Sequence, residues 1–421
     1  MRPRTGTRVC SPSWACGPSA VRLRPRPRPA PINPAQSLQQ HLTDALQRHQ
    51  EAGLTRSRRV LGSPQGPEIR IGGRSYVAFC SNDYLGLANH PRVTAAMQRA
   101  VRECGVGSGA SHLITGHHAA HHALEEELAA FVGSEAAVLF STGYMANLCV
   151  AAVLLGRRDT VFSDRLNHAS LVDAARLSGA RQQRYRHADP AHLETLLAAD
   201  PGVNKLVLTD GVFSMDGDFA PLPALTGVAN RANAWLMVDD AHGLGVVGPE
   251  GRGSCAHFAL GQNDIPILMG TLGKALGVFG AFVAGSRALT EAMIQFGRTY
   301  TYTTALPPAV AEAARESLRV LAEEDWRRAH LQDLVLRFRR GAANIGLAIT
   351  ESPTPIQPVI LGSAEAAVSL SRQLEERGIY VPAIRPPTVP KGTARLRVTF
   401  SAAHSPEHVD RLLNTLAELS P

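Results

Sequence analysis

The sequence predicts an α/β protein with a large doubly wound domain, built on a mainly parallel sheet, and a small C-terminal α/β domain. Short apolar runs alternate with helical patterns between residues 95 and 296, which is the order of strands joined by crossover helices. Several runs end in glycine, hydroxyl or charged residues, as strands do where a sheet edge binds ligands. The spacing of the elements changes near residue 356, which indicates the second domain.

The positive charge of the chain is concentrated at its start. Residues 1–30 contain seven arginines and neither lysine nor acid, so the other 391 residues are neutral although the whole chain carries +7. A neutral body argues against a nucleic-acid partner. The Arg/Pro-rich residues 1–35 should be disordered, and they lack the apolar stretch of a secretory signal. We interpret them as an idle extension, with an organelle-targeting segment as the alternative.

Composition also limits where the protein acts. A chain of 421 residues with 44% hydrophobic content can bury the cores of two or three domains. Its six cysteines are dispersed and form no C-x-x-C pair, which predicts free thiols and a cytoplasmic location. No apolar run approaches the roughly 18 residues of a membrane span, so we expect no membrane partner.

Periodicity and helix-ending residues define the remaining elements. Leucines recur at helical spacing from Leu38 to Leu46, with Gly53 as a plausible C-cap, and we expect this helix to pack on the body or on a second subunit. The last region should contain strands at 356–361 and 394–400 and helices at 364–377 and after Ser405. The predicted divisions are 36–94, an opening helix and small segment, 95–305, the large domain, and 306–421, a linking helix and the small domain.

A lysine between glycines follows a predicted strand, in the segment Met269-Gly-Thr-Leu-Gly-Lys-Ala-Leu-Gly277. The amine of this residue, Lys274, is accessible and can form a Schiff base with a carbonyl cofactor. Thr271, three residues earlier, can hold a phosphate. A Gly-Lys-X-X-Gly turn alone is more often structural than catalytic, so the interpretation depends on the strands upstream.

A second predicted strand, residues 234–238, ends in Asp239, Asp240 and His242. A carboxylate at the carboxyl end of a parallel strand lies where ligands bind, and it can pair with the protonated nitrogen of a pyridine ring. Because side chains alternate along a strand, only one of the two aspartates can point toward a given face. A loop with an N-capping aspartate is the structural alternative.

Three further segments place polar groups at the same predicted edge. The strand at 205–210 leads to Ser214, and an earlier strand leads through Gly143 to a helix that starts near Tyr144. Unpaired amides at such a helix start can bind a phosphate. Between these segments, His168 offers an aromatic ring that can stack on a cofactor. So many polar strand ends in one order indicate a built site.

These segments resemble the α-oxoamine synthase family of fold-type I pyridoxal phosphate (PLP) enzymes, from about Leu38 to Leu419. The likeness rests on Ser81-Asn-Asp-Tyr-Leu-Gly-Leu87, Gly105-Val-Gly-Ser-Gly109, Asn167-His-Ala-Ser-Leu171, Gly211-Val-Phe-Ser-Met-Asp-Gly217, Val238-Asp-Asp-Ala-His-Gly243, Ala383-Ile-Arg-Pro-Pro-Thr-Val-Pro390 and Gly392-Thr-Ala-Arg-Leu-Arg397. The resemblance implies a PLP-dependent acyltransferase of that fold, in which residues 95–305 bind the cofactor.

The resemblance also implies roles for single residues. It assigns the Schiff base to Lys274, the ring nitrogen to Asp239 and the face of the ring to His168, all three catalytic. It assigns further cofactor contacts to Gly143, Tyr144, Ser214, His242, Thr271, Thr303 and Thr304, the last two acting on the neighbouring subunit of a homodimer. Its substrate contacts are Arg385 for the amino-acid carboxylate, with His168, Thr388 and Arg56, for which Arg58 is the alternative.

Within the family, the likeness is strongest to members that condense L-alanine with a pimeloyl thioester in biotin biosynthesis, releasing CO2 and the thiol. The implied acyl carrier is CoA or an acyl carrier protein. The nearest alternative is another α-oxoamine synthase, such as glycine C-acetyltransferase. A non-catalytic PLP-binding regulator is an alternative of a different class, but residues 1–35 are too few for the DNA-binding module that it needs.

A run of histidines, residues 117–122, has the i, i+4 spacing of zinc ligands on a helix. No third ligand stands at the spacing of a metal site. We interpret the run as a solvated helix start and expect no metal.

Overall fold

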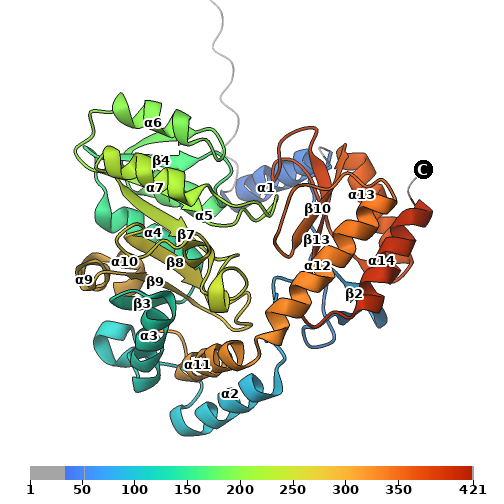
Figure 1. Ribbon diagram of the computed structural model, residues 1–421, viewed down its shortest axis with the longest axis horizontal. Helices are drawn as coiled ribbons and strands as arrows, with labels where there is room; N and C mark the ends of the chain where they lie inside the picture. Colours follow the sequence, from blue (N-terminus) through green and yellow to red (C-terminus); the bar gives the residue numbers. More distant parts are fainter. Residues whose placement is uncertain (1–33, 52, 420–421) are drawn as a thin grey trace, which may run out of the picture. The chain divides into compact units, whose positions relative to one another are not determined.

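The computed structural model describes residues 34–51 and 53–419 (Figure 1). The chain divides into two compact units, the first of which ends at Arg59. Most of the tail expected to be disordered lies outside the described residues, and its last two residues, 34 and 35, begin a helix. The domain divisions expected at residues 95 and 306 stay predictions.

The first unit contains helix α1 (Pro34–Glu51). The helix ends where Gly53 takes a left-handed conformation with φ 65°. The N–H of Gly53 donates to the carbonyl of Gln50 (2.9 Å), and the N–H of Leu54 donates to that of His49 (3.0 Å). This pair of bonds is a glycine C-cap, as expected. No side chain of α1 is buried, and the expected packing of its leucines stays a prediction.

The second unit is built on a seven-stranded sheet in the order β3-β9-β8-β7-β6-β4-β5. Its strands are β3 (Ala136–Phe140), β4 (Thr160–Asp164), β5 (Arg181–Tyr185), β6 (Lys205–Asp210), β7 (Trp235–Asp239), β8 (Ile267–Thr271) and β9 (Ala281–Gly285). The strands from β8 to β5 pair in parallel, whereas β9 runs antiparallel to both β8 and β3. The mainly parallel sheet expected from the sequence is confirmed.

The central strands are buried on both faces, which explains their continuous apolar runs. In β6, Leu206 and Leu208 join one hydrophobic cluster and Val207 joins another, because successive side chains point to opposite faces. The first cluster includes side chains of α4 (Gly143–Leu154), α5 (Ala169–Leu177), α9 (Arg287–Phe296) and α10 (Arg298–Thr301). The second includes side chains of α6 (Pro190–Ala198), α7 (Leu222–Arg231) and α8 (Ser254–His257).

The C-terminal region has its own antiparallel sheet, in the order β10-β13-β12. Its elements are α11 (Pro308–Glu323), α12 (Trp326–Asn344), β10 (Ile356–Gly362), α13 (Ala364–Glu376), β12 (Ala383–Ile384), β13 (Ala394–Thr399) and α14 (Pro406–Leu419). The strands and helices predicted here are therefore confirmed to within one residue at each end that was given. In residues 34–51 and 53–419, no helix has both the length and the apolar content needed to cross a membrane.

A third, small sheet joins the two ends of the second unit. Strands β1 (Glu68–Ile71) and β2 (Arg74–Ala78) form a hairpin, and β2 pairs in parallel with β11 (Ile379–Tyr380). Helices α2 (Pro91–Cys104) and α3 (Ala119–Val132) then lead into the large sheet. This pairing joins segments about 300 residues apart, so no local pattern predicts it.

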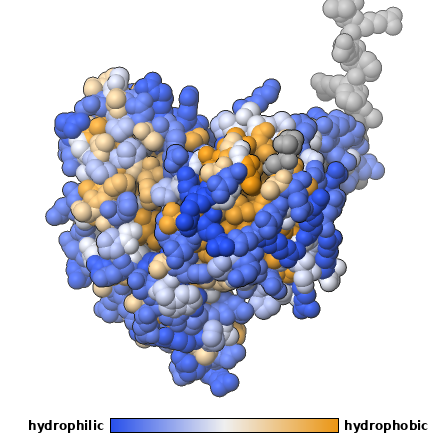
Figure 2. Space-filling view, turned by 45° about the vertical axis from the view of Figure 1, so that its right-hand side comes forward, coloured by the Kyte–Doolittle hydropathy of each residue, from blue (hydrophilic) through white to orange (hydrophobic). Residues whose placement is uncertain are grey.

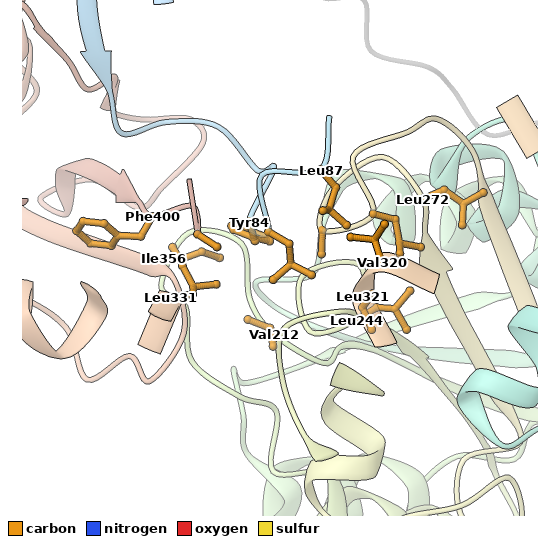
Figure 3. Close-up of a cluster of buried hydrophobic side chains, with 14 of the residues drawn as sticks. Tyr84, Leu87, Val212, Leu244, Leu272, Val320, Leu321, Leu331, Ile356 and Phe400 are labelled. Atoms are coloured by element: carbon orange, nitrogen blue, oxygen red, sulfur yellow. The ribbon is translucent and has the colours of Figure 1, made fainter. Parts of the chain in front are cut away.

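One hydrophobic cluster runs from the C-terminal sheet to the lysine-bearing loop (Figure 3). Phe400 and Ile356 lie at one end of it, Tyr84 lies between, and Leu244 and Leu272 lie at the other end. All five side chains are buried. A close-packed interior of this kind is weakly compressible. The C-terminal sheet therefore keeps a fixed position relative to the carboxyl ends of the large sheet.

A histidine between two carboxylates ties together loops at the same sheet edge. Nδ1 of His187 is 3.0 Å from Oδ1 of Asp164, and its Nε2 is 2.9 Å from Oδ2 of Asp218. Burial opposes a positive charge on the ring, but the two carboxylates outweigh it and raise the pKa of His187 to about 10. The protonated ring therefore stabilises the loop that carries Ser214.

We expect His187→Gln to lower the free energy of unfolding by about 3 kcal/mol near pH 6, and this loss to shrink at higher pH. The pKa of the folded state lies above the ordinary value of 6.5. The stabilisation is therefore complete below about pH 6.5 and disappears as the pH rises toward about 10. Denaturant unfolding of both proteins at several pH values measures the difference. A difference that does not change with pH would show that the ring is neutral.

Candidate active site

A cavity of about 180 Å³ lies at the carboxyl ends of β6, β7 and β8. Its walls are Gly143, Tyr144, His168, Ser170, Asp210, Asp239, Ala241, His242, Met269, Thr271 and Lys274. Asp210, Asp239 and Thr271 are the last residues of their strands. The structure thus brings together seven of the residues that the sequence proposed for the cofactor: Gly143, Tyr144, His168, Asp239, His242, Thr271 and Lys274.

Asp239 presents its carboxyl group to this cavity. Its Oδ2 accepts a hydrogen bond from Nδ2 of Asn147 (2.8 Å), and its Oδ1 accepts one from the N–H of Ala241 (3.1 Å). Asp210 is buried at the end of the neighbouring strand. Burial and the charge of Asp239 raise the pKa of Asp210 well above its usual range. Burial therefore favours the uncharged form of Asp210 beside the carboxylate of Asp239.

Asp240 does not line the cavity. Its Oδ2 accepts the backbone N–H of Ser254 (2.7 Å), and a Cβ at Gly253 would come within 2.0 Å of the same oxygen. Gly253 has φ 96°, a conformation that favours glycine. Burial raises the pKa of Asp240 to about 7. The alternation that the sequence left open is thus resolved, with Asp239 on the cavity side and Asp240 against a glycine-containing loop.

Lys274 ends a chain of hydrogen bonds that begins outside the cavity wall. Its Nζ is 2.8 Å from Nε2 of His242, and Nδ1 of His242 is 2.7 Å from the hydroxyl of Tyr84. Burial and the positive charge of Arg397 lower the pKa of Lys274 to about 8, although Asp239 acts in the opposite direction. Burial also lowers the pKa of His242 well below its usual value. The neutral imidazole can therefore accept a hydrogen bond from the lysine and donate one to the tyrosine.

His168 forms a fixed wall of the cavity. Its Nδ1 is 2.7 Å from Oγ of Ser170, and that Oγ accepts a hydrogen bond from Nδ2 of Asn147 (2.8 Å). The serine hydroxyl therefore donates to Nδ1 of His168. The backbone N–H of His168 donates to Oδ2 of Asp210 (2.8 Å), and burial lowers the pKa of the ring. These contacts hold a neutral imidazole in one orientation.

The start of α4 is the electropositive end of the cavity. The hydroxyl of Thr142 caps the helix by accepting the N–H of Met145. The backbone amides of Gly143 and Tyr144 then have no acceptor within the described residues. Thr271 lines the same cavity from the end of β8. Free helix amides beside a hydroxyl form a phosphate-binding site.

The groups around this cavity fit PLP. A carboxylate can pair with the ring nitrogen, free amides can hold the phosphate, and an imidazole can cover the face of the ring. The amine of Lys274, with its pKa of about 8, can lose its proton near neutral pH and react with an aldehyde. The fit depends on the donor set as a whole, because each group supplies what one part of that cofactor needs.

Four residues that were not predicted from the sequence complete this site: Tyr84, Asn147, Asp210 and Arg397. Arg397 is buried on β13, and its Nε donates to the carbonyl of Ser214 (2.6 Å). Arg395 and Arg397 stand two residues apart in β13, a strand in which every residue is buried. Buried arginines are rare unless paired, so this spacing is a signal that the sequence offered.

Other proposed residues lie outside this cavity. Ser214 is not on its wall, and neither Thr303 nor Thr304 lines it within one chain. Thr388 lines a neighbouring cavity. The roles proposed for these four residues stay predictions. Arg56, another proposed substrate contact, belongs to the first unit.

The histidine run is a helix start, as predicted, but the expectation that it is solvated is wrong in part. His118 caps α3, and His121 is fully buried. Nδ1 of His121 accepts the N–H of His118 (2.9 Å), and its Nε2 lies 2.7 Å from the carbonyl of Leu306. His112, His117 and His121 are close enough to share an ion, which the spacing did not predict. Because both nitrogens of His121 are engaged with the backbone, this ring has a structural role.

Comparison with known proteins agrees with this geometry. Residues 74–416 match the aminotransferase class I and II family. The 8-amino-7-oxononanoate synthase of Nitrosococcus oceani is 61% identical over 374 residues, which are 89% of this chain and 99% of that protein. The enzyme of the same name from Methylococcus capsulatus is 62% identical over 87% of this chain and 95% of its own. This chain belongs to the 8-amino-7-oxononanoate synthase family.

Solved structures support the assignment to this synthase family. A serine palmitoyltransferase of Sphingomonas wittichii aligns with a TM-score of 0.85 and 32% identity, over 92% of this chain and 98% of that one. The 8-amino-7-oxononanoate synthase of Francisella tularensis aligns with a TM-score of 0.72 and 31% identity, over 82% and 97%. A serine palmitoyltransferase from S. paucimobilis, with a TM-score of 0.85 and 32% identity over 92% and 98%, has bound PLP. The expected fold-type I PLP-dependent fold is confirmed, and PLP is the cofactor of this synthase family.

Proposed function

We propose that this protein joins L-alanine to a pimeloyl thioester to give 8-amino-7-oxononanoate, CO2 and the free thiol, a step of biotin biosynthesis. One observation carries the proposal: Asp239 and Lys274 line a single cavity with a phosphate-binding helix start. The chain that holds this arrangement is 61% identical to a protein of that name. The acyl carrier is CoA or an acyl carrier protein.

PLP bound in the cavity supplies a conjugated ring that spreads negative charge away from the reacting carbon. The side chains supply the rest. The carboxylate of Asp239, held by Asn147, can pair with a protonated ring nitrogen. Lys274, with a pKa of about 8, can release and take back a proton at Nζ near neutral pH. His242, 2.8 Å from that amine, orients it, and His168 excludes water from one side.

The carboxylate of the amino acid requires a guanidinium group, which can form two parallel hydrogen bonds with it. We assign this role to Arg385, because the prolines that follow it restrict the local backbone. Arg397 is a second candidate, since its charge lowers the pKa of Lys274 and so acts on the same cavity. His168, Thr388 and Arg56, with Arg58 as the alternative to Arg56, are the other substrate-binding candidates.

Arg385→Lys should raise the KM for alanine about tenfold or more, because lysine keeps the charge but not the bidentate geometry. The KM for the pimeloyl thioester and the absorbance of the PLP-loaded protein should not change. Steady-state kinetics in both substrates measure the effect, with Arg397→Lys as the matched variant. An alanine KM that rises in the Arg397 variant alone would assign the carboxylate to Arg397.

We propose that the protein acts as a homodimer, in which Thr303 and Thr304 serve the cavity of the second copy. Ser111 forms a β-bridge with Thr304, and large apolar side chains in the two segments that this bridge joins are exposed, with Val106 at 79%, Ile114 at 74% and Tyr302 at 73%. Orange apolar patches lie among hydrophilic residues on the face in Figure 2. Exposed apolar surface of this kind is typical of subunit contacts. Analytical ultracentrifugation of the protein gives its oligomeric state.

The test of the proposed function is a comparison of four substrate pairs, alanine or glycine with pimeloyl-CoA or acetyl-CoA. We expect turnover to be highest with alanine and pimeloyl-CoA, with 8-amino-7-oxononanoate as the product detected by mass. Preference for glycine and acetyl-CoA would instead assign the glycine C-acetyltransferase activity. Replacing CoA by an acyl carrier protein in the same assay identifies the natural donor.

We place this reaction in the cytoplasm. Cys80, Cys104, Cys149 and Cys255 are free thiols, which suits a reducing compartment. A regulator that binds PLP without catalysis is the competing class of function. Such a protein would bind PLP but give no product with any of the four substrate pairs.

A further inference from the structure

A second cavity lies beside the first and has no role in the chemistry described so far. It has a volume of about 380 Å³ and lies between the loop after β4 and the loop from Pro387 to Pro390. Asn167 lines this cavity, and its neighbour His168 lines the first one. Two consecutive residues therefore line the two cavities. Its volume is within the range of small-molecule sites.

The walls of the second cavity suit an apolar chain. Leu166, Phe213, Met215, Pro387 and Val389 present hydrocarbon surface. The charged residues among the lining are Arg165 and Asp216, and Asp216 forms an ion pair with the buried Arg395. With the aspartate neutralised, the unbalanced charge of this cavity is the positive charge of Arg165.

The Arg165 guanidinium has no hydrogen-bond or ion-pair partner within residues 34–51 and 53–419, although its backbone is firmly held. The carbonyl of Arg165 accepts a hydrogen bond from the guanidinium of Arg184. On one side Asp164 accepts the N–H of Leu166 (2.8 Å), and on the other Asn167 donates to the carbonyl of Leu208 (2.9 Å). A free cation on a fixed turn is prepared to bind an anion without reorganising the loop.

We propose that this cavity binds the far end of the acyl substrate, and that Arg165 recognises its terminal carboxylate. The proposal rests on the proposed function, in which the acyl group is a seven-carbon chain that ends in a carboxylate. Arg165 and His168 are three residues apart, so their Cα atoms are separated by at most about 11 Å. An acyl carbonyl beside His168 can therefore extend its methylenes along the apolar wall and reach the guanidinium.

Arg165 would then determine specificity for a dicarboxylic chain. A guanidinium holds a carboxylate by two parallel hydrogen bonds, and a chain that ends in a methyl group leaves it unused. Thr388, on the same wall, offers a hydroxyl as a further donor. Thr388, already proposed as a substrate contact, would then contact the acyl chain rather than the amino acid.

The test uses Arg165→Met and Arg165→Lys in the PLP-loaded protein, with pimeloyl-CoA and heptanoyl-CoA as acyl donors. The two donors share CoA and chain length, and they differ in the terminal carboxylate. We expect Arg165→Met to raise the KM for pimeloyl-CoA by ten- to a hundredfold and to leave the KM values for heptanoyl-CoA and alanine unchanged. Arg165→Lys should give an intermediate KM, because it keeps the charge without the fork.

A binding measurement without turnover accompanies the kinetics. Calorimetric titration of the PLP-loaded protein with pimelate and with heptanoate should show weaker pimelate binding in Arg165→Met and no change for heptanoate. Arg157→Met is the matched control, since Arg157 is also exposed but precedes the opposite end of β4. The control should behave as wild type in both measurements.

Two results would overturn the proposal. Equal losses with both acyl donors would mean that Arg165 contacts CoA or supports the fold, and a raised alanine KM would assign it to the amino acid. Failure of the proposed function itself is distinguishable, because wild type would then fail to convert alanine and pimeloyl-CoA before any variant is compared.

Discussion

Replacing Lys274 by alanine should give a folded protein that has lost its turnover and its covalent hold on PLP. The amine of Lys274 is the nucleophile of the cavity wall, and burial lowers its pKa to about 8. Alanine removes both the covalent attachment and the group that exchanges a proton with the substrate. We expect kcat to fall by at least about a thousandfold, the scale observed when a nucleophile or base is removed.

The small number of lysines makes the site of cofactor attachment easy to identify. The chain has three lysines, Lys205, Lys274 and Lys391. Borohydride reduction of the PLP-loaded wild type, followed by peptide mass analysis, should place the cofactor on Lys274. Lys391→Ala is the control, since Lys391 is exposed and should not affect labelling or turnover. A reduced adduct that persists in Lys274→Ala would show that another amine holds the cofactor.

The strands that carry the site were predictable because a buried parallel strand appears in the sequence as a continuous apolar run. Strand β6 occupies residues 205–210 as predicted, and β7 starts and ends within one residue of the predicted run. Apolar residues fill such strands because both faces are covered. The carboxyl ends of parallel strands lie at the same edge of the sheet, which is why most of the proposed cofactor residues line one cavity.

The supporting contacts were not predictable in the same way. Tyr84 contacts His242 across 158 residues, and Asn147 contacts Asp239 across 92. Neither Tyr84 nor Asn147 stands at the end of a strand, so periodicity gives them no role. Their position follows from the packing of separate elements, and such long-range contacts leave no local pattern in a single sequence.

Arg397 illustrates a different limit. Its spacing from Arg395 was visible, but its relevance depends on the β13 strand lying against the loop of Ser214. A buried guanidinium needs partners, and here they are the carbonyl of Ser214 and Oδ1 of Asn82, 3.2 Å away. The sequence contained all three residues without indicating that they meet.

Asp239→Asn should keep the fold and much of the PLP binding while lowering kcat by about a hundred- to a thousandfold. An amide cannot stabilise a protonated ring nitrogen, and loss of a preorganised electrostatic partner costs about 3–4 kcal/mol in the transition state. The fold should tolerate the change because asparagine has the same shape. In addition, Oδ1 of Asn147 is buried without a partner in the described residues, so a rotated Asn147 amide can accept from the new NH2 group.

Asp240→Asn is the matched control for this experiment, since it makes the same chemical change one residue along the strand. Burial raises the pKa of Asp240 to about 7, so near neutral pH a large fraction of this carboxyl is already uncharged. Its contact with the N–H of Ser254 can be kept by an amide oxygen, so we expect turnover within a few-fold of wild type. Single-turnover kinetics and PLP absorbance of both variants measure the contrast. Wild-type rates in Asp239→Asn together with a large loss in Asp240→Asn would reverse the assignment and place the charge that the ring needs on the other side of β7.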